Sequence, residues 1–108
     1  DALVLLGDPT FPGCHLRVRP VGVFWMQDEA GPDAKDLCVL SNDPRWEHIR
    51  DIDDLRPHFR AEIHHFFEAY KDLEPGKETT IRGWEGRDAA LAAIAEAQAD
   101  YLSSGAAH

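Results

Sequence analysis

The apolar residues of this chain follow two kinds of spacing, which predict strands in its first half and helices in its second. Residues 2–6 form an almost continuous apolar run, the pattern of a strand that is buried on both faces. Residues 16–26 alternate, as the two faces of a half-buried strand do. Proline cannot donate to a strand ladder and glycine weakens a strand, so Pro20 and Gly22 predict a bulge or a bend in this segment.

A β-hairpin is predicted after the second strand. Gly31 and Pro32 separate the apolar run that ends at Met26 from another run over residues 37–40. Because glycine and proline often interrupt regular structure, we expect the turn at these two residues and the next strand over 37–40. A later run of β-forming residues, 77–84, predicts the last strand.

Two segments in the second half follow the 3.6-residue period of an amphipathic helix. The first begins at Pro57 and ends near residues 74–76. Its apolar stripe consists of Phe59, Ile63, Phe66, Phe67 and Tyr70. The second covers residues 87–102 and is rich in alanine, a strong helix former. Its apolar stripe consists of Leu91, Ile94, Ala95, Tyr101 and Leu102.

The segment between the hairpin and the first helix carries an acidic cluster. Asp51, Asp53 and Asp54 lie just before the helix, where carboxylates commonly accept hydrogen bonds from the first backbone N–H groups. A calcium-binding loop is the alternative, but the cluster lacks the central glycine and the terminal glutamate of an EF-hand loop. Capping of the helix is therefore the favoured interpretation.

Composition narrows the class of protein. The length of 108 residues predicts a single domain over residues 1–108. The 20 acidic residues exceed the 11 basic ones, and the resulting charge of −9 argues against a nucleic-acid partner. No apolar run approaches the about 20 residues that span a bilayer, so we expect no membrane partner either. Cys14 and Cys38 show no paired spacing and no leader is present, which predicts a cytoplasmic protein with free thiols.

Candidate chemistry gathers at the predicted hairpin. Asp28 and Asp33 are expected on opposite arms of one loop, and two carboxylates that lie close together repel each other unless a cation separates them. Hard oxygen ligands of this kind suit Mg²⁺ or Mn²⁺. Lys35 follows, and an ammonium beside a hard metal is suited to phosphate oxygens. A solvated turn is the alternative, because Asp, Glu, Gly and Pro are ordinary turn residues.

Tyr70 and Lys71, at the end of the first predicted helix, are the other candidates for chemistry. A phenol and an ammonium side by side can hold phosphate oxygens if this end of the helix faces the hairpin. Alternatively, Tyr70 completes the apolar stripe and Lys71 complements the negative end of the helix. The spacing of the residues does not decide between these interpretations.

Three stretches together carry more specific information than any single turn or helix. They are R-P-V-G at residues 19–22, D-E-A-G-P-D-A-K at 28–35 and H-F-F-E-A-Y-K-D-L-E-P-G-K at 65–77. In this order and spacing they closely resemble the soluble family I inorganic pyrophosphatases of bacteria. The resemblance runs from Asp1 to about Leu102. It identifies the chain as the C-terminal part of such a domain.

The resemblance implies a mainly β fold, an OB-like β-barrel that is incomplete in this chain, with two flanking α-helices. It also implies hydrolysis of inorganic pyrophosphate to two phosphates by a metal-activated water, without a covalent intermediate. The implied cofactor is Mg²⁺, with Mn²⁺ as a substitute. The implied metal ligands are Asp1, Asp28 and Asp33, and the implied substrate-binding residues are Lys35, Tyr70 and Lys71.

Asp1 matches the last aspartate of the family signature D-x-D-P-x-D, and the rest of that signature would lie upstream. Because the chain starts at this residue rather than at methionine, we expect a fragment whose general base precedes residue 1. The resemblance further implies a homo-oligomer, often a hexamer in bacteria, and we expect exposed aromatic residues such as Trp46 and Trp84 in its contacts. The alternative function is a noncatalytic acidic domain that binds a divalent cation or a protein through the same loop.

Overall fold

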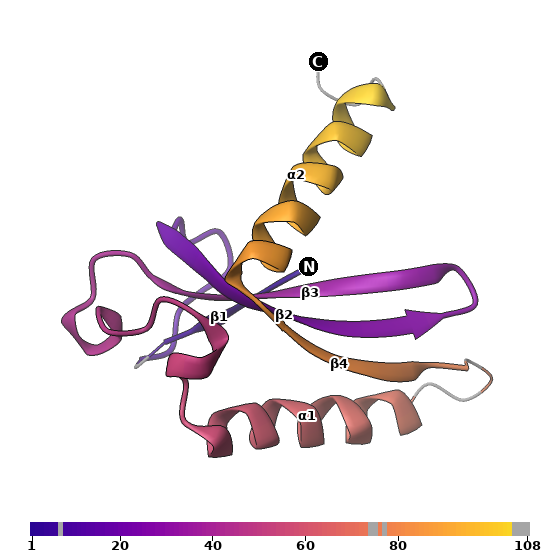
Figure 1. Cartoon of the computed structure of the whole chain (residues 1–108), viewed down its shortest axis with the longest axis horizontal. Helices are drawn as coiled ribbons and strands as arrows, with labels where there is room; N and C mark the ends of the chain where they lie inside the picture. The colour runs from indigo at the N-terminus through magenta and orange to yellow at the C-terminus, as the bar shows by residue number, and fades with distance from the viewer. Residues whose placement is uncertain (7, 74–75, 77, 105–108) are drawn as a thin grey trace.

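The computed structural model describes residues 1–6, 8–73, 76 and 78–104 (Figure 1). In this part of the chain, one sheet contains the strands β1 (Ala2–Leu5), β2 (Val18–Asp28), β3 (Gly31–Leu40) and β4 (Thr80–Gly86). The helices are η1 (Pro44–Trp46), η2 (Ile52–Asp54), α1 (Pro57–Asp72) and α2 (Arg87–Ser103). The strand order β1-β3-β2-β4 leaves the sheet open. The predicted OB-like β fold with two flanking helices and an unclosed barrel is therefore confirmed.

The hairpin between β2 and β3 turns earlier than predicted. Asp28 is paired with Gly31, so the loop consists of Glu29 and Ala30, and the predicted turn at Gly31 and Pro32 is wrong. The Asp28 carboxylate accepts the N–H of Ala30 at 2.8 Å, and Gly31 has a φ of 121°, which a residue with a Cβ rarely adopts. Pro32 is tolerated inside β3 because β1 pairs only with residues 36–39 of that strand, so within the described part of the chain one edge has no ladder at Pro32.

The predicted irregularity in β2 is confirmed. The register of β2 against β3 shifts between Pro20 and Gly22, as in a β-bulge. The intervening Val21 is fully buried and joins the core cluster that contains Leu37. A second shift occurs against β4, where Gly83 has a φ of 115°.

The main core lies between the sheet and two segments that pack on it, residues 49–55 and α1. One cluster consists of Val21, Leu37, Val39, Ile49, Ile52 and Leu55, and the other of Phe24, Met26 and Phe67. The predicted stripe of α1 is only partly right, because Phe66 and Tyr70 are 58% and 46% exposed. Successive helical residues are about 100° apart, so Phe66 points away when its neighbour Phe67 faces the sheet.

Helix α2 leaves the sheet directly after β4 and projects beyond it, whereas α1 runs alongside β4 (Figure 1). Ala90, in its first turn, is fully buried, but Leu91, Tyr101 and Leu102 are 41%, 54% and 66% exposed. The predicted stripe of α2 is therefore wrong apart from Ile94, which is partly buried. None of the described helices is long and apolar enough to cross a membrane.

Three further expectations about burial are wrong. Trp46 and Trp84 were expected to be exposed, but both are partly buried and pack against the core clusters. β1 was expected to be buried on both faces, but among the described strands it lies at an edge of the sheet and pairs only with β3. Its residues Leu3 and Leu5, which share one face of the strand, pack against the core.

Asp51 joins the loop before α1 to the start of α2. Its Oδ1 accepts the N–H groups of Ile52 at 2.7 Å and of Arg87 at 3.0 Å, and Asp54 completes a capping box at η2. The aspartates do accept backbone N–H groups, as the capping interpretation expected, but the prediction that they cap the helix beginning at Pro57 is wrong. Arg56 precedes α1 without a side-chain cap.

Replacing Asp51 with alanine is expected to lower the free energy of unfolding by about 1–2 kcal/mol, because two backbone donors lose their acceptor. Urea denaturation measures this change. Asp53→Ala is the control, since Asp53 is exposed and its carboxylate makes no hydrogen bond within the described residues. Equal losses in the two variants would show that the capping bonds do not matter.

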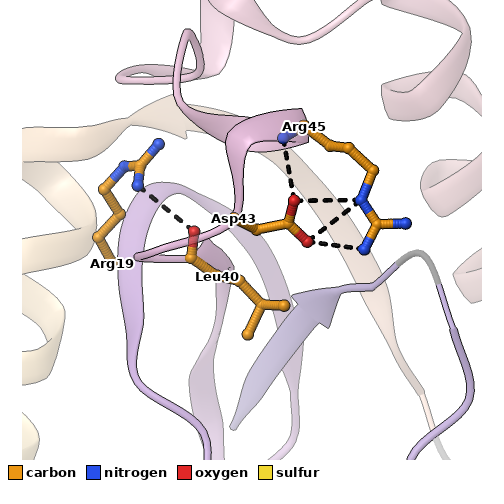
Figure 2. Close-up of polar contacts among 4 residues, drawn as sticks. All are labelled: Arg19, Leu40, Asp43 and Arg45. Atoms are coloured by element: carbon orange, nitrogen blue, oxygen red, sulfur yellow. Dashed lines mark hydrogen bonds and ion pairs between the residues drawn. The ribbon is translucent and has the colours of Figure 1, made fainter.

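The guanidinium of Arg19 organises the loop that follows β3. Nη1 donates to the carbonyls of Leu40 and Ser41 at 3.4 and 3.2 Å, and Nε and Nη2 donate to the carbonyl of Ile49 at 3.2 and 2.9 Å. Nη2 also donates to the carbonyl of Trp46. Figure 2 shows the bond to Leu40. One side chain therefore satisfies four backbone carbonyls of a segment that has little regular structure of its own.

The same loop is closed locally by an ion pair, also shown in Figure 2. Asp43 Oδ1 accepts the backbone N–H of Arg45 at 2.9 Å, and its Oδ2 lies 2.7 Å from Arg45 Nη2. Hydrogen bonds from Arg45 hold the pKa of the Asp43 carboxyl below its ordinary value. The carboxylate thereby caps η1.

Candidate active site

Lys35 on β3 lies at the centre of a group of charged side chains. β1 runs parallel to β3 with Ala2 opposite Asp36, so the preceding residue, Asp1, lies beside Lys35. Lys35 Nζ is 2.9 Å from Asp1 Oδ2 and 2.6 Å from Asp33 Oδ2, and its side chain is 14% exposed. One ammonium thus bridges a carboxylate of β3 and the carboxylate of Asp1, the residue just before β1.

The hairpin adds Asp28 on the same side of the sheet. Met26 is paired with Asp33, and alternate residues of a strand share a face, so Asp28 points to the side that α1 covers. Its Oδ1 accepts the N–H of Ala30, and its Oδ2 makes no hydrogen bond within the described residues. The expectation that Asp28 and Asp33 lie on opposite arms of the hairpin is confirmed.

The last turns of α1 complete the wall of the site. A hollow of about 220 Å³ is lined by Met26, Asp28, Asp33, Lys35, Phe67, Tyr70, Lys71 and Thr79. The C-terminal end of α1 therefore faces the hairpin, which the sequence had left open. Lys71 Nζ lies 3.2 Å from Glu68 Oε2, and this contact lowers the pKa of the Glu68 carboxyl.

Met26, Phe67 and Thr79 line the hollow but were not predicted as site residues. Met26 precedes Asp28 by two positions in a strand, so the alternation of side chains was a usable signal. The place of Phe67 in the apolar stripe of the helix predicted only a core residue. Thr79 has no distinguishing pattern around it in the sequence.

The donor set suits a hard cation. Asp1 and Asp33 already hold a positive charge between them, the Lys35 ammonium, and carboxylate oxygens are the ligands that Mg²⁺ prefers. Within residues 1–6, 8–73, 76 and 78–104, no three acidic, histidine or cysteine side chains are arranged as a ready metal site. A cation here would therefore keep water or phosphate oxygens as further ligands, as Mg²⁺ commonly does. The calcium loop at residues 51–54 gains no support.

Asp36, the neighbour of Lys35, lies on the opposite face of the sheet and lines a hollow together with Ile94 and Gln98 of α2. Its Oδ1 is buried and has no hydrogen-bond partner among the described residues. Burial raises the pKa of this carboxyl above its ordinary value. The Asp36 side chain thus lies on the other face of the sheet from Lys35, although Asp1, at the start of the edge strand, lines the same hollow as Asp36.

Asp36→Asn is expected to raise the stability at neutral pH. Because the pKa of Asp36 is higher in the folded than in the unfolded state, its charged form opposes folding above the folded-state pKa. The penalty falls as the pH drops through that pKa and disappears when both states are protonated. Calorimetry should show a higher melting temperature for the variant at pH 7 and no difference in acid. A variant that melts lower at pH 7 would contradict this account.

The family model described as inorganic pyrophosphatase matches residues 1–102. The chain belongs to the inorganic pyrophosphatase family. The inorganic pyrophosphatase of Streptomyces coelicolor is 53% identical over 105 residues, which cover 97% of this chain and 64% of that protein. The inorganic pyrophosphatase of Leifsonia xyli is 60% identical over 84 residues, which cover 78% of this chain and 52% of that protein.

Solved structures of inorganic pyrophosphatases share the fold. The protein from Thermus thermophilus superposes with a TM-score of 0.86 at 44% identity, over 94% of this chain and 59% of that one. The protein from Helicobacter pylori gives 0.85 at 39% identity, over 94% and 61%. The chain thus spans between half and two thirds of the length of these pyrophosphatases. The family resemblance carried by the three sequence stretches is confirmed.

Proposed function

We propose that this protein hydrolyses inorganic pyrophosphate to two phosphates in a reaction that depends on Mg²⁺, with Mn²⁺ as a substitute. The observation that carries the proposal is the convergence of carboxylates, ammonium groups and a phenol on one hollow of about 220 Å³. Relatives that carry the name inorganic pyrophosphatase support it, although this chain spans only part of their length. A noncatalytic binding domain is the less favoured alternative.

For the metal we propose Asp1, Asp28 and Asp33 as ligands. When bound, Mg²⁺ supplies polarisation of phosphate oxygens and a lower pKa for a coordinated water. Asp1 and Asp33 meet at one cation already, and Asp28 Oδ2, which makes no hydrogen bond to the residues that the structure describes, lies on the same face. Asp28 and Asp33 bring negative charge to a hollow that must otherwise bind an anion, and Asp1 adjoins it through Lys35, so a metal between these carboxylates would reconcile the two charges.

For the substrate we propose Lys35, Tyr70 and Lys71. Pyrophosphate carries several negative charges, and more charge develops on the leaving phosphate as the bond to the bridging oxygen breaks. The two ammonium groups neutralise this charge and the Tyr70 hydroxyl donates a hydrogen bond. Following the family resemblance, we place the general base upstream of residue 1.

The proposal also covers the oligomeric state and the cellular location of the protein. We propose a cytoplasmic homo-oligomer, a hexamer in the simplest case, that uses no nucleic-acid or membrane partner. Cys14 and Cys38 are free, in keeping with a reducing compartment, and the net charge is −9. Exposed apolar side chains such as Phe66, Leu73 and Leu102 supply surface for contacts between subunits. Light scattering of the complete gene product that reports only a monomer would contradict the oligomer.

Phosphate release from pyrophosphate by the complete gene product tests the function. We expect release with Mg²⁺, slower or equal release with Mn²⁺, and none with EDTA. Calorimetric titration with Mg²⁺, compared with the release assay, separates the two functions, because the alternative domain binds the cation but releases no phosphate. Mg²⁺ binding without metal-dependent phosphate release would contradict the enzyme proposal and favour the alternative.

A further inference from the structure

Phe67 forms the inner wall of the hollow and contacts two of the proposed substrate-binding residues. The side chain is 5% exposed and lines the hollow. The Lys35 ammonium lies 5.8 Å from the centre of its ring, and the Tyr70 ring meets it edge to face at 6.5 Å and 79°. The ring stacks on Phe24 at 5.4 Å, so it is itself held by the core.

A phenylalanine ring at this position makes two contacts that an aliphatic side chain cannot make, one with the Lys35 ammonium and one with the Tyr70 ring. The face of a phenylalanine ring carries partial negative charge, which attracts a cation within about 6 Å, and more strongly where water is excluded. Lys35 is 14% exposed, so its contact with the ring is largely desolvated. The edge-to-face arrangement with Tyr70 also depends on a ring. A leucine would fill the space but would leave both neighbours less constrained.

Phe66, the adjacent residue, provides an internal comparison. Its ring contacts Phe67 at 5.1 Å and Tyr70 at 6.0 Å, but it is 58% exposed and is not part of the wall of the hollow. The two phenylalanines of the H-F-F stretch are equivalent in composition and in helix propensity. Only Phe67 faces the ammonium.

We propose that Phe67 is a positioning residue for the proposed reaction. Its ring fixes the Lys35 ammonium from one side and the Tyr70 phenol from the other, so that both point at the phosphate oxygens before substrate arrives. Such preorganisation is effective because the groups need not reorient as charge develops. This inference rests on the proposed pyrophosphate hydrolysis.

The test replaces Phe67, in the complete gene product, with a series of phenylalanines that carry increasing numbers of fluorine atoms. Fluorination weakens the negative face of the ring step by step while the shape changes little. We expect log(kcat/KM) for pyrophosphate to fall steadily with fluorination, to a total of about five- to tenfold, the scale of one desolvated cation–π contact. The inhibition constant of inorganic phosphate should rise in parallel, and the melting temperature should not follow the series.

The same series at Phe66 is the matched control and should leave kcat/KM and phosphate inhibition flat. Phe67→Leu and Phe66→Leu give a second comparison, in which only the first should weaken phosphate binding when both are measured below their melting temperatures. If wild-type turnover is metal-dependent but the Phe67 series is flat, the positioning role is wrong and the proposed function stands. If the wild type shows no metal-dependent turnover, both proposals are wrong.

Discussion

Asp33→Asn is expected to lower the turnover of pyrophosphate by the complete gene product at least ~10²-fold, on the scale of losing one preorganised electrostatic group. Asp33 lines the hollow, and its Oδ2 lies 2.6 Å from Lys35 Nζ. Asparagine keeps the size of the side chain but halves its coordinating oxygens and removes its charge. Both the proposed metal site and the orientation of Lys35 are therefore weakened by one substitution.

Phosphate release measures the loss of turnover, and calorimetric titration with Mg²⁺ should show a matching loss of affinity. Asp36→Asn is the control, because this carboxylate lies three residues later on the other face of the sheet and should leave turnover nearly unchanged. If the two substitutions prove equally mild in a folded protein, the site does not lie on this hairpin.

Arg19→Met is expected to cause the largest loss of stability, about 3 kcal/mol, because several carbonyls lose a charged donor. The guanidinium donates to the carbonyls of Leu40, Ser41, Trp46 and Ile49. Methionine keeps most of the length of the aliphatic part and donates no hydrogen bond. Since small domains are stable by only about 5–15 kcal/mol, the change should be clear in urea denaturation.

Arg17→Met is the matched control for Arg19, since Arg17 is exposed and lies just before β2. Its substitution should change the free energy of unfolding by less than about 0.5 kcal/mol. Arg19→Lys should recover only part of the stability, because an ammonium cannot reach carbonyls on several sides as the planar guanidinium does. A loss for Arg19→Met no larger than for Arg17→Met would show that the carbonyls are satisfied in another way.

Some features of the fold were predictable because their causes are local. Pro20 and Gly22 remove a donor and a side chain from one strand, and the bulge occurs at that place. Pro57 begins α1 as expected of a residue without an N–H group to satisfy. The predicted end of α1 at residues 74–76 and the start of the last strand at 77 fall partly outside the described residues, while β4 itself is found at Thr80–Gly86.

Other expectations failed where two local signals competed. Gly31 and Pro32 are strong turn residues, but the Asp28 carboxylate closes the loop two residues earlier, and the open edge of β3 tolerates proline. In α2, periodicity alone could not indicate how far the sheet extends beneath the helix. Leu91 and Leu102 are therefore exposed although they fit the helical period.

The sequence by itself determined the family and the two helices, and it supplied the prediction of six site residues, because short motifs and helical periods are local properties of the chain. Only the tertiary structure decided that Asp1 lies beside Lys35, that the end of α1 faces the hairpin and that Phe67 lies against the ammonium. These relations depend on strand register and helix packing, which join residues more than thirty positions apart. Shifting one strand by a single residue would turn its side chains to the other face without changing any local pattern.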